Sequence, residues 1–395
     1  MIDKAPVAAN ANPLPLGPAL VAMTALQALV ALALFAPGVL APRLGLGVAD
    51  VGLFTTAVFA VGMSTSLYGG TLARRYGPCR VAAFCAVAVA CGMVLAGVSG
   101  RFWLIAAGVC VGLAFGPETP ASSALLSKLA RPEQRPLIFS VRQTGNQIGA
   151  IVGSLALPAI AMAHATAGYG LIAAIALIAA VLLAWLGQRY DPVARGDGAS
   201  LDLMASLKLV AGQPDLRALA LVSVPFSAMQ LALNAFLVTF AVTILAHDHL
   251  TAGVLLAVAQ AGGLIGRLFW GVVATKAVQS RVLLAGLGIG MSAAALGMAL
   301  LGPHVSLAGQ TALAFVFGLT ASGWNGVFLA EVARLAPAGR IAEVTGAVLT
   351  ASYAGLLLGP ALVTLVAMAG TLSASYVMLA LCTCAATLQL VRTRS

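Results

Sequence analysis

Long stretches of this chain carry no charged side chain, and this feature restricts the possible fold more than any other. Residues 51–73 and 81–100 contain no Asp, Glu, Lys or Arg, and residues 143–188, 282–330 and 344–391 are equally free of them. A helix that spans the hydrocarbon core of a bilayer needs about 20 mostly apolar residues. The two shorter runs therefore each predict one membrane helix, and the three longer runs each predict two.

Four further apolar runs complete the set of predicted helices. They lie near residues 18–41, 102–127, 218–246 and 250–275. We therefore predict an all-α membrane protein with twelve transmembrane helices. Charged residues make up only 8% of the chain, against about 25% in soluble domains. The net charge of +10 does not indicate nucleic-acid binding, because the basic residues stand singly between apolar runs and form no single patch.

The positions of the basic residues predict how the chain is threaded through the membrane. All but four of the 21 Lys and Arg residues fall on one side of the predicted helices. The exceptions are Arg43 and Arg101 on the other side, and Arg142 and Arg267 within helices. Because loops rich in Lys and Arg stay in the cytoplasm, we expect both termini there. The predicted location is the cell inner membrane, as an integral multi-pass protein.

One polar connector divides the predicted helices into two sets of six. We predict a cytoplasmic tail at 1–17, a six-helix bundle at 18–188, a cytoplasmic connector at 189–217, a second six-helix bundle at 218–391 and a tail at 392–395. The two sets repeat each other in sequence. Gly70 matches Gly271 at an offset of 201 residues, and Gly112 matches Gly318 at an offset of 206.

Two parallel six-helix repeats with a cytoplasmic connector resemble the major facilitator superfamily over essentially the whole chain. The turn GGTLARRYGPCR resembles that family's Gly-x-Leu-x-Asp-Arg-x-Gly-Arg pattern, with Gly70, Arg75 and Gly77 at matching positions. Arg74 stands where the family has an aspartate, which is thought to help hold the cytoplasmic ends of the two halves together. Glu343, in the first turn of a later predicted helix, could form a charge-reversed version of that latch with Arg74. Two unrelated interfacial charges are the alternative.

Arg267 interrupts the apolar stretch GGLIGRLFWG. It lies nine residues from Lys276, or about 13 Å inside the membrane, where a charge is costly unless it faces a cavity or a partner. The stretch resembles the Gly-Arg-x-x-x-Gly segment of monocarboxylate- and oxalate-type members of the superfamily, whose arginine binds the substrate carboxylate. The resemblance implies the same role for Arg267, and a guanidinium fork suits a carboxylate. A structural ion pair or a closely packed arginine is the alternative.

Two further charges lie within predicted helices. Arg142 is about 10 Å inside the membrane and shares a helical face with Asn146. Glu118 lies at a similar depth on the preceding helix. Arg142 and Glu118 either form a structural ion pair, or Glu118 is a protonatable coupling site whose charge state governs Arg142.

Polar residues at helical spacing predict the rest of a substrate cavity. Gln230 and Asn234 continue a stripe that starts at Ser223, and Asn325 and Tyr353 interrupt apolar runs further along the chain. Transporter cavities use such polar lines, whereas hydrogen bonds between helices would give the same pattern. The predicted substrate-binding set is therefore Arg267, Arg142, Asn146, Gln230, Asn234, Asn325 and Tyr353.

Taken together, these features predict a secondary active transporter. The sequence has no nucleotide-binding loop, no paired catalytic carboxylates and no nucleophile with a base, so we expect neither an enzyme nor a cofactor or metal. We predict a monomer that moves a small organic anion by alternating access, driven by proton symport through Glu118 or by anion exchange. A drug/proton antiporter that exports hydrophobic or cationic compounds is the alternative, and a receptor or enzyme that does not transport is a third possibility.

Overall fold

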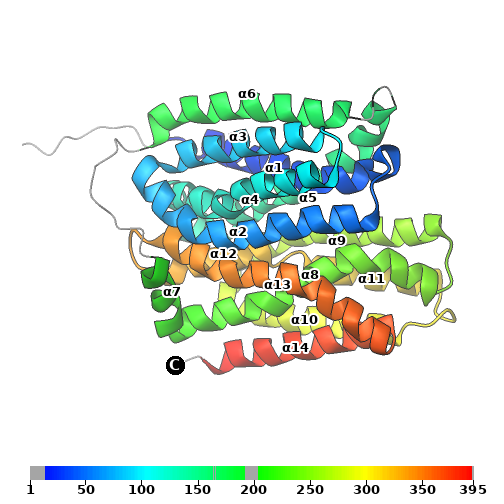
Figure 1. Ribbon diagram of the computed structural model, residues 1–395. Helices are drawn as coiled ribbons and strands as arrows, with labels where there is room; N and C mark the ends of the chain where they lie inside the picture. The colour runs from blue at the N-terminus through cyan, green and yellow to red at the C-terminus, as the bar shows by residue number, and fades with distance from the viewer. Residues whose placement is uncertain (1–13, 163, 165, 192–202, 394–395) are drawn as a thin grey trace, which may run out of the picture.

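The computed structural model of this chain describes residues 14–162, 164, 166–191 and 203–393 (Figure 1). These residues form α-helices, one short 3-10 helix and no strand. The first half contains α1 (Leu16–Leu44), α2 (Val48–Tyr76), α3 (Pro78–Ala96), α4 (Arg101–Leu129), η1 (Pro132–Gln134), α5 (Arg135–Ala161) and α6 (Ala167–Tyr190). The second half contains α7 (Leu203–Gly212), α8 (Pro214–Thr243), α9 (His249–Lys276), α10 (Ser280–Leu300), α11 (Leu307–Ala321), α12 (Asn325–Leu335), α13 (Ile341–Ala369) and α14 (Leu372–Arg392).

Twelve crossings confirm the predicted all-α membrane architecture. Among the described residues, eleven segments are long and apolar enough to cross a membrane, and one of them, Leu307–Leu335, consists of α11 and α12 together. The twelfth crossing is α5, which at 27 residues reaches about 40 Å and carries a row of polar side chains. The break between α11 and α12 was not predicted. Beside it, Trp270 Nε1 donates a hydrogen bond to Leu319 O (2.9 Å), as expected where a neighbouring helix satisfies freed backbone groups.

The helices pair in the same way in the two halves, which confirms the predicted repeats. In the first half, α1 packs on α5, α2 on α4 and α3 on α6. In the second half, α8 packs on α13, α9 on α11 and α10 on α14. Figure 1 shows α1–α6 as one layer of helices and α8–α14 as another, with the short α7 beside their ends.

Glycines matched by the sequence repeat allow equivalent close contacts between helices. A Cβ atom added at Gly318 would lie 1.8 Å from Ala259 O, and one at Gly112 would lie 2.8 Å from Val58 O. Ala259 follows Val58 at the same offset of 201 residues that relates the surrounding helices. Membrane helices use small residues in this way to bring backbones together. The repeat in sequence therefore records a repeated helix packing.

The end of α6, which leads into the connector, lies at one end of the molecule beside the start of α1 and the turn between α2 and α3. Tyr190 Oη at the end of α6 donates to Pro15 O before α1 (2.7 Å), and the Asp191 carboxylate accepts from the backbone N–H of Cys79 and Arg80 (2.9 Å each). Gly77 in this turn has φ +97°, a conformation that favours glycine. We call this end the connector face, and α7 lies on it (Figure 1).

The limits of the predicted segments are not tested by this architecture. Residues 1–13 of the predicted tail, 192–202 of the predicted connector and 394–395 of the predicted C-terminal tail lie outside the described residues. Within the range predicted as connector, α6 ends, α7 forms and α8 begins. The boundaries at 17, 188, 217 and 391 therefore stay predictions.

Candidate functional site

The two halves pack tightly against each other on the connector side of the molecule. α2 packs on α13, and α5 packs on α9 and α12. A Cβ atom at Gly70 would lie 2.3 Å from Glu343 N, and one at Gly326 would lie 2.2 Å from Ser140 Oγ. Because even a methyl group does not fit at these contacts, the passage between the halves is closed toward the connector face.

A cavity of about 160 Å³ lies between the halves beyond these contacts. Its lining reaches Thr55, two turns from the start of α2, and therefore extends toward the face opposite the connector. Amide, hydroxyl and carboxyl groups line it together with aromatic rings. The polar lining residues include Gln27, Glu118, Thr119, Gln143, Asn146, Ser227, Gln230, Asn234, Asn325 and Tyr353, and the aromatic ones are Phe35, Phe59, Phe115, Trp324 and Phe328.

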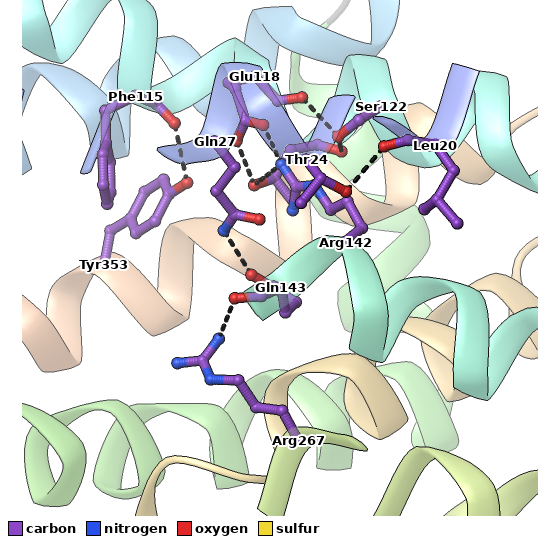
Figure 2. A network of polar contacts seen from close by, with 11 residues as sticks. Leu20, Thr24, Gln27, Phe115, Glu118, Ser122, Arg142, Gln143, Arg267 and Tyr353 are labelled. Atoms are coloured by element: carbon purple, nitrogen blue, oxygen red, sulfur yellow. Dashed lines mark hydrogen bonds and ion pairs between the residues drawn. The ribbon is translucent and has the colours of Figure 1, made fainter. Parts of the chain in front are cut away.

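Most of the polar residues singled out in the sequence meet in this cavity. Five of the predicted substrate-binding residues line it, together with Glu118; these are Asn146, Gln230, Asn234, Asn325 and Tyr353. Asn325 Nδ2 donates to Gln230 Oε1 (3.0 Å), and Tyr353 Oη donates to Phe115 O (3.2 Å; Figure 2). The buried Asn234 Oδ1 has no hydrogen-bond partner. The structure thus brings residues of α5, α8, α12 and α13 to one place.

Arg142 and Glu118 form an ion pair beside the cavity (Figure 2). Both residues are buried, with exposed fractions of 1% and 3%. Arg142 Nη2 also donates to Thr119 Oγ1 (3.2 Å), and Thr119 Oγ1 donates to Glu118 Oε2 (3.0 Å). Glu118 lines the cavity whereas Arg142 lies behind it. A ligand or proton in the cavity therefore reaches the carboxylate first.

Arg267 does not face the cavity directly but lies behind its lining, which the sequence alone does not indicate. It is completely buried and does not line the cavity. Its Nη1 donates to the backbone carbonyl of Gln143 (2.7 Å), whose side chain does line the cavity and accepts from Gln27 Nε2 (2.5 Å; Figure 2). Arg267 Nε and Nη2 have no hydrogen-bond partner. Among the described residues, no carboxylate pairs with Arg267.

Gln27 is among the cavity residues that were missed in the sequence. Gln27 lies in α1 and links the first helix to α5 through Gln143. A signal was present, because Thr24 and Gln27 alone carry hydrogen-bonding side chains in residues 18–41. A single amide in such a run costs free energy in lipid unless it faces a partner or a cavity.

The charged residues of the signature turn also meet across the two halves. Arg74 forms an ion pair with Glu343, and Arg340 Nε donates to the other oxygen of the same carboxylate (2.8 Å). Glu343 is buried with an exposed fraction of 4%. Arg75 points elsewhere and lies over the Tyr76 ring, 5.3 Å from its centroid. The structure therefore places an acid of α13 between two arginines at the connector face.

Replacing Gly70 by alanine should shift the protein away from this closed arrangement. The new methyl group would meet Glu343 N at 2.3 Å, so the connector ends of α2 and α13 must separate. We expect longer distances between spin labels at Arg131→Cys and Ala338→Cys, measured in a variant without the native cysteines. Gly52→Ala on the same helix is the control, because no atom lies within 4 Å of its Cβ position. Unchanged distances in Gly70→Ala would contradict the assignment of this contact as a gate.

Comparison with known proteins agrees with the fold. The sequence model of the Major Facilitator Superfamily matches residues 19–360, and the chain belongs to this family of membrane transporters. No curated protein matches the chain in sequence.

Solved transporters share the fold at low sequence identity. The Escherichia coli fucose:proton symporter FucP is 15% identical with a TM-score of 0.76, covering 95% of this chain and 98% of that one. A bacterial homologue of the iron transporter ferroportin, in an outward-facing state, is 15% identical with a TM-score of 0.77, covering 96% and 99%. The human organic anion transporter MFSD10 (TETRAN) is 17% identical with a TM-score of 0.74, covering 95% and 99%. At these identities the likeness establishes the fold alone.

Proposed function

We propose that this protein is a secondary active transporter that moves a small organic anion, most simply a carboxylate, by alternating access. The observation that carries the proposal is the charge of Arg267. Its guanidinium is buried at the interface of the two halves, and two of its nitrogens, Nε and Nη2, have no hydrogen-bond partner. No acid among the described residues forms an ion pair with it. A charge at such depth is expensive unless a ligand or partner compensates it. A substrate anion would supply that compensation.

The other interior charges leave this positive charge unbalanced. Arg142 is neutralised by Glu118, whereas none of the ion pairs among the described residues includes Arg267. Protonation of Glu118 would release a second positive charge beside the cavity. This arrangement favours anions over the cationic compounds that a drug/proton antiporter would export.

The cavity lining suits an organic anion with an apolar body. Amide groups such as Asn146 and Asn234 can orient a polar group, while Phe59 and Phe328 offer apolar surface. Ligand sites of this kind combine mainly apolar walls with a few placed polar groups. Gln143 stands between the cavity and Arg267. We propose that the anion displaces the contact between Gln27 and Gln143 and so reaches the guanidinium.

Orientation follows from the basic residues of the connector face. Loops rich in Lys and Arg favour the cytoplasm, so we propose that this face is cytoplasmic and that the membrane is the cell inner membrane. The described state is then outward-facing, since its closed contacts lie on the connector side. The two halves of one chain line the cavity together, which supports a monomer as the working unit.

Proton coupling is proposed to act at Glu118. Protonation would weaken its ion pair with Arg142 and strengthen the positive potential of the cavity, so proton and anion binding would favour each other. Uptake of the anion should then rise as the external pH falls. Anion exchange is the alternative driving force, and it predicts uptake that depends on an internal anion and little on pH.

The contact between Arg74 and Glu343 is proposed to latch the cytoplasmic ends together. A double-mutant cycle with Arg74→Gln and Glu343→Gln should show a coupling free energy of about 0.5–1 kcal/mol, because the arginine is partly exposed. Thermal unfolding of the purified variants measures it. The matched cycle, which combines Arg75→Gln with Glu343→Gln, should show no coupling, since Arg75 contacts the Tyr76 ring and not Glu343. Equal coupling in both cycles, or no coupling in either, would contradict the proposal that Arg74 and Glu343 form a latch.

Uptake into proteoliposomes tests the proposed function. Purified protein is reconstituted, and the entry of labelled monocarboxylates, dicarboxylates, neutral sugars and cationic amphiphiles is compared at two external pH values. We expect one class of carboxylate to accumulate while sugars and cations do not. Transport of cations alone would favour the antiporter, and transport of sugars alone would remove the role given to Arg267.

A further inference from the structure

A second cavity lies at the connector face, between the two halves. It has a volume of about 550 Å³ and is bordered by α2, α4 and α5 on one side and by α12 and α13 on the other. Four basic residues line it, and Glu343 is the one acid among the residues that border it. The basic residues are Arg74, Lys128 and Arg135 from the first half and Arg334 from the second.

Two of these cations are already neutralised by protein acids. Arg74 pairs with Glu343, and Arg334 forms two hydrogen bonds to the Glu331 carboxylate (2.7 and 2.8 Å). These contacts neutralise one cation of the first half and one of the second half at the cavity wall.

The remaining two cations are not neutralised in the described part of the chain. Arg135 Nη2 donates to the Ser127 carbonyl (3.0 Å), while its buried Nε has no partner. Lys128 is exposed and forms no ion pair there. The N-terminal ends of α5 and α13 also border the cavity, and helix N-termini favour anions. The wall therefore offers an excess of positive charge and free N–H donors.

We infer that this cavity binds a phosphate-bearing anion, either the headgroup of an anionic phospholipid or a free phosphate compound. Several cations spread around one cavity match a ligand with more than one anionic oxygen, and Arg guanidinium pairs well with phosphate. The position at the membrane surface admits both sources. This site is separate from the central cavity and does not depend on which substrate the protein transports.

Binding at this site should stabilise the closed connector face. The ligand would contact Lys128 and Arg135 of one half and Arg334 of the other, so it fits only while the halves stay together. A ligand that binds one state better shifts the population toward that state. The site would therefore hold the gate formed by Gly70 and Glu343 shut.

Thermal unfolding of the full-length purified protein tests the inference. Two probes are compared at constant ionic strength: inorganic pyrophosphate added to detergent-solubilised protein, and phosphatidylglycerol added to phosphatidylcholine nanodiscs. The variants are Lys128→Gln and Arg135→Gln, and the control is Arg131→Gln, a basic residue of the same turn that does not line the cavity. Because Lys128 is exposed, its variant keeps the test valid if Arg135→Gln fails to fold.

We expect a probe to stabilise wild type and Arg131→Gln, and Lys128→Gln to weaken its apparent affinity about tenfold, the effect of losing one charge-assisted contact. Stabilisation by pyrophosphate identifies a free phosphate compound as a ligand, whereas stabilisation by phosphatidylglycerol alone identifies a lipid headgroup. Equal stabilisation of all variants, or of none, would overturn the site. If the wild-type protein binds a phosphate probe at this cavity but transports no carboxylate, the proposed function is overturned while the inference about this site stands.

Discussion

Carboxylate uptake should fall at least about 100-fold when Arg267 is replaced by glutamine, because two charge-assisted contacts of about 1.5–3 kcal/mol each are lost. The folded protein should remain, and its free energy of unfolding should not decrease. Arg267 is buried and pairs with no acid in the described ranges of the chain, so glutamine removes an uncompensated charge from the membrane interior. A structural arginine would behave in the opposite way and lose stability. Uptake in proteoliposomes and thermal unfolding of the same preparation separate the two roles.

Two matched variants control this prediction. Lys276→Gln removes a positive charge from the exposed end of the same helix, and uptake should change little. Arg267→Lys keeps the charge but loses the planar fork of donors, so it should retain part of the uptake. Full activity of Arg267→Gln would show that the anion does not use this residue.

The second large effect is expected at the buried pair of Arg142 and Glu118. Arg142→Gln should lower the free energy of unfolding by about 3–5 kcal/mol, because it leaves the Glu118 carboxylate buried without a counter-charge. The double variant Arg142→Gln with Glu118→Gln removes both charges and should recover most of that stability. Thermal or denaturant unfolding of wild type, the single variants and the double variant measures the difference. A double variant no more stable than Arg142→Gln alone would contradict the pairing.

The pH dependence of uptake shows whether Glu118 is only the structural partner of Arg142 or also a site of proton coupling. Glu118→Gln mimics the protonated acid, so its uptake should lose dependence on external pH while anion binding persists. If Glu118→Gln keeps the pH dependence of wild type, proton coupling does not act through this carboxylate. Arg101→Gln, which removes a surface partner of Asp50, serves as the control and should keep the wild-type pH profile.

The twelve crossings and the repeat were predictable because lipid imposes them. A charge-free run of sufficient length has few alternatives to a membrane helix, and glycines such as Gly112 and Gly318 mark contacts that recur in both halves. The break between α11 and α12 was not predictable from apolar content, because residues 322–324 remain in an uncharged run. Its nearby carbonyl is bound by Trp270 of another helix, a contact that only the folded structure reveals.

The sequence pointed to five polar residues that line the cavity, but not to the position of Arg142 and Arg267 behind that lining. Helical spacing identified Asn146, Gln230 and Asn234 because polar side chains in lipid must face a partner or a cavity. It did not reveal that Gln143 separates Arg267 from the cavity, because that contact uses a backbone carbonyl of the other half. Gln27 was missed because it and Thr24 are the only hydrogen-bonding side chains in residues 18–41, and two residues make too short a pattern to define a polar stripe.

Ligand-dependent thermal stabilisation of the purified protein tests the central claim most directly. Wild type and Arg267→Gln are heated with a panel of mono- and dicarboxylates, inorganic anions, sugars and cationic amphiphiles. We predict that at least one carboxylate raises the unfolding temperature of wild type and leaves that of Arg267→Gln unchanged. If cationic compounds stabilise both proteins equally and no carboxylate stabilises wild type, the interior of this transporter does not bind an anion.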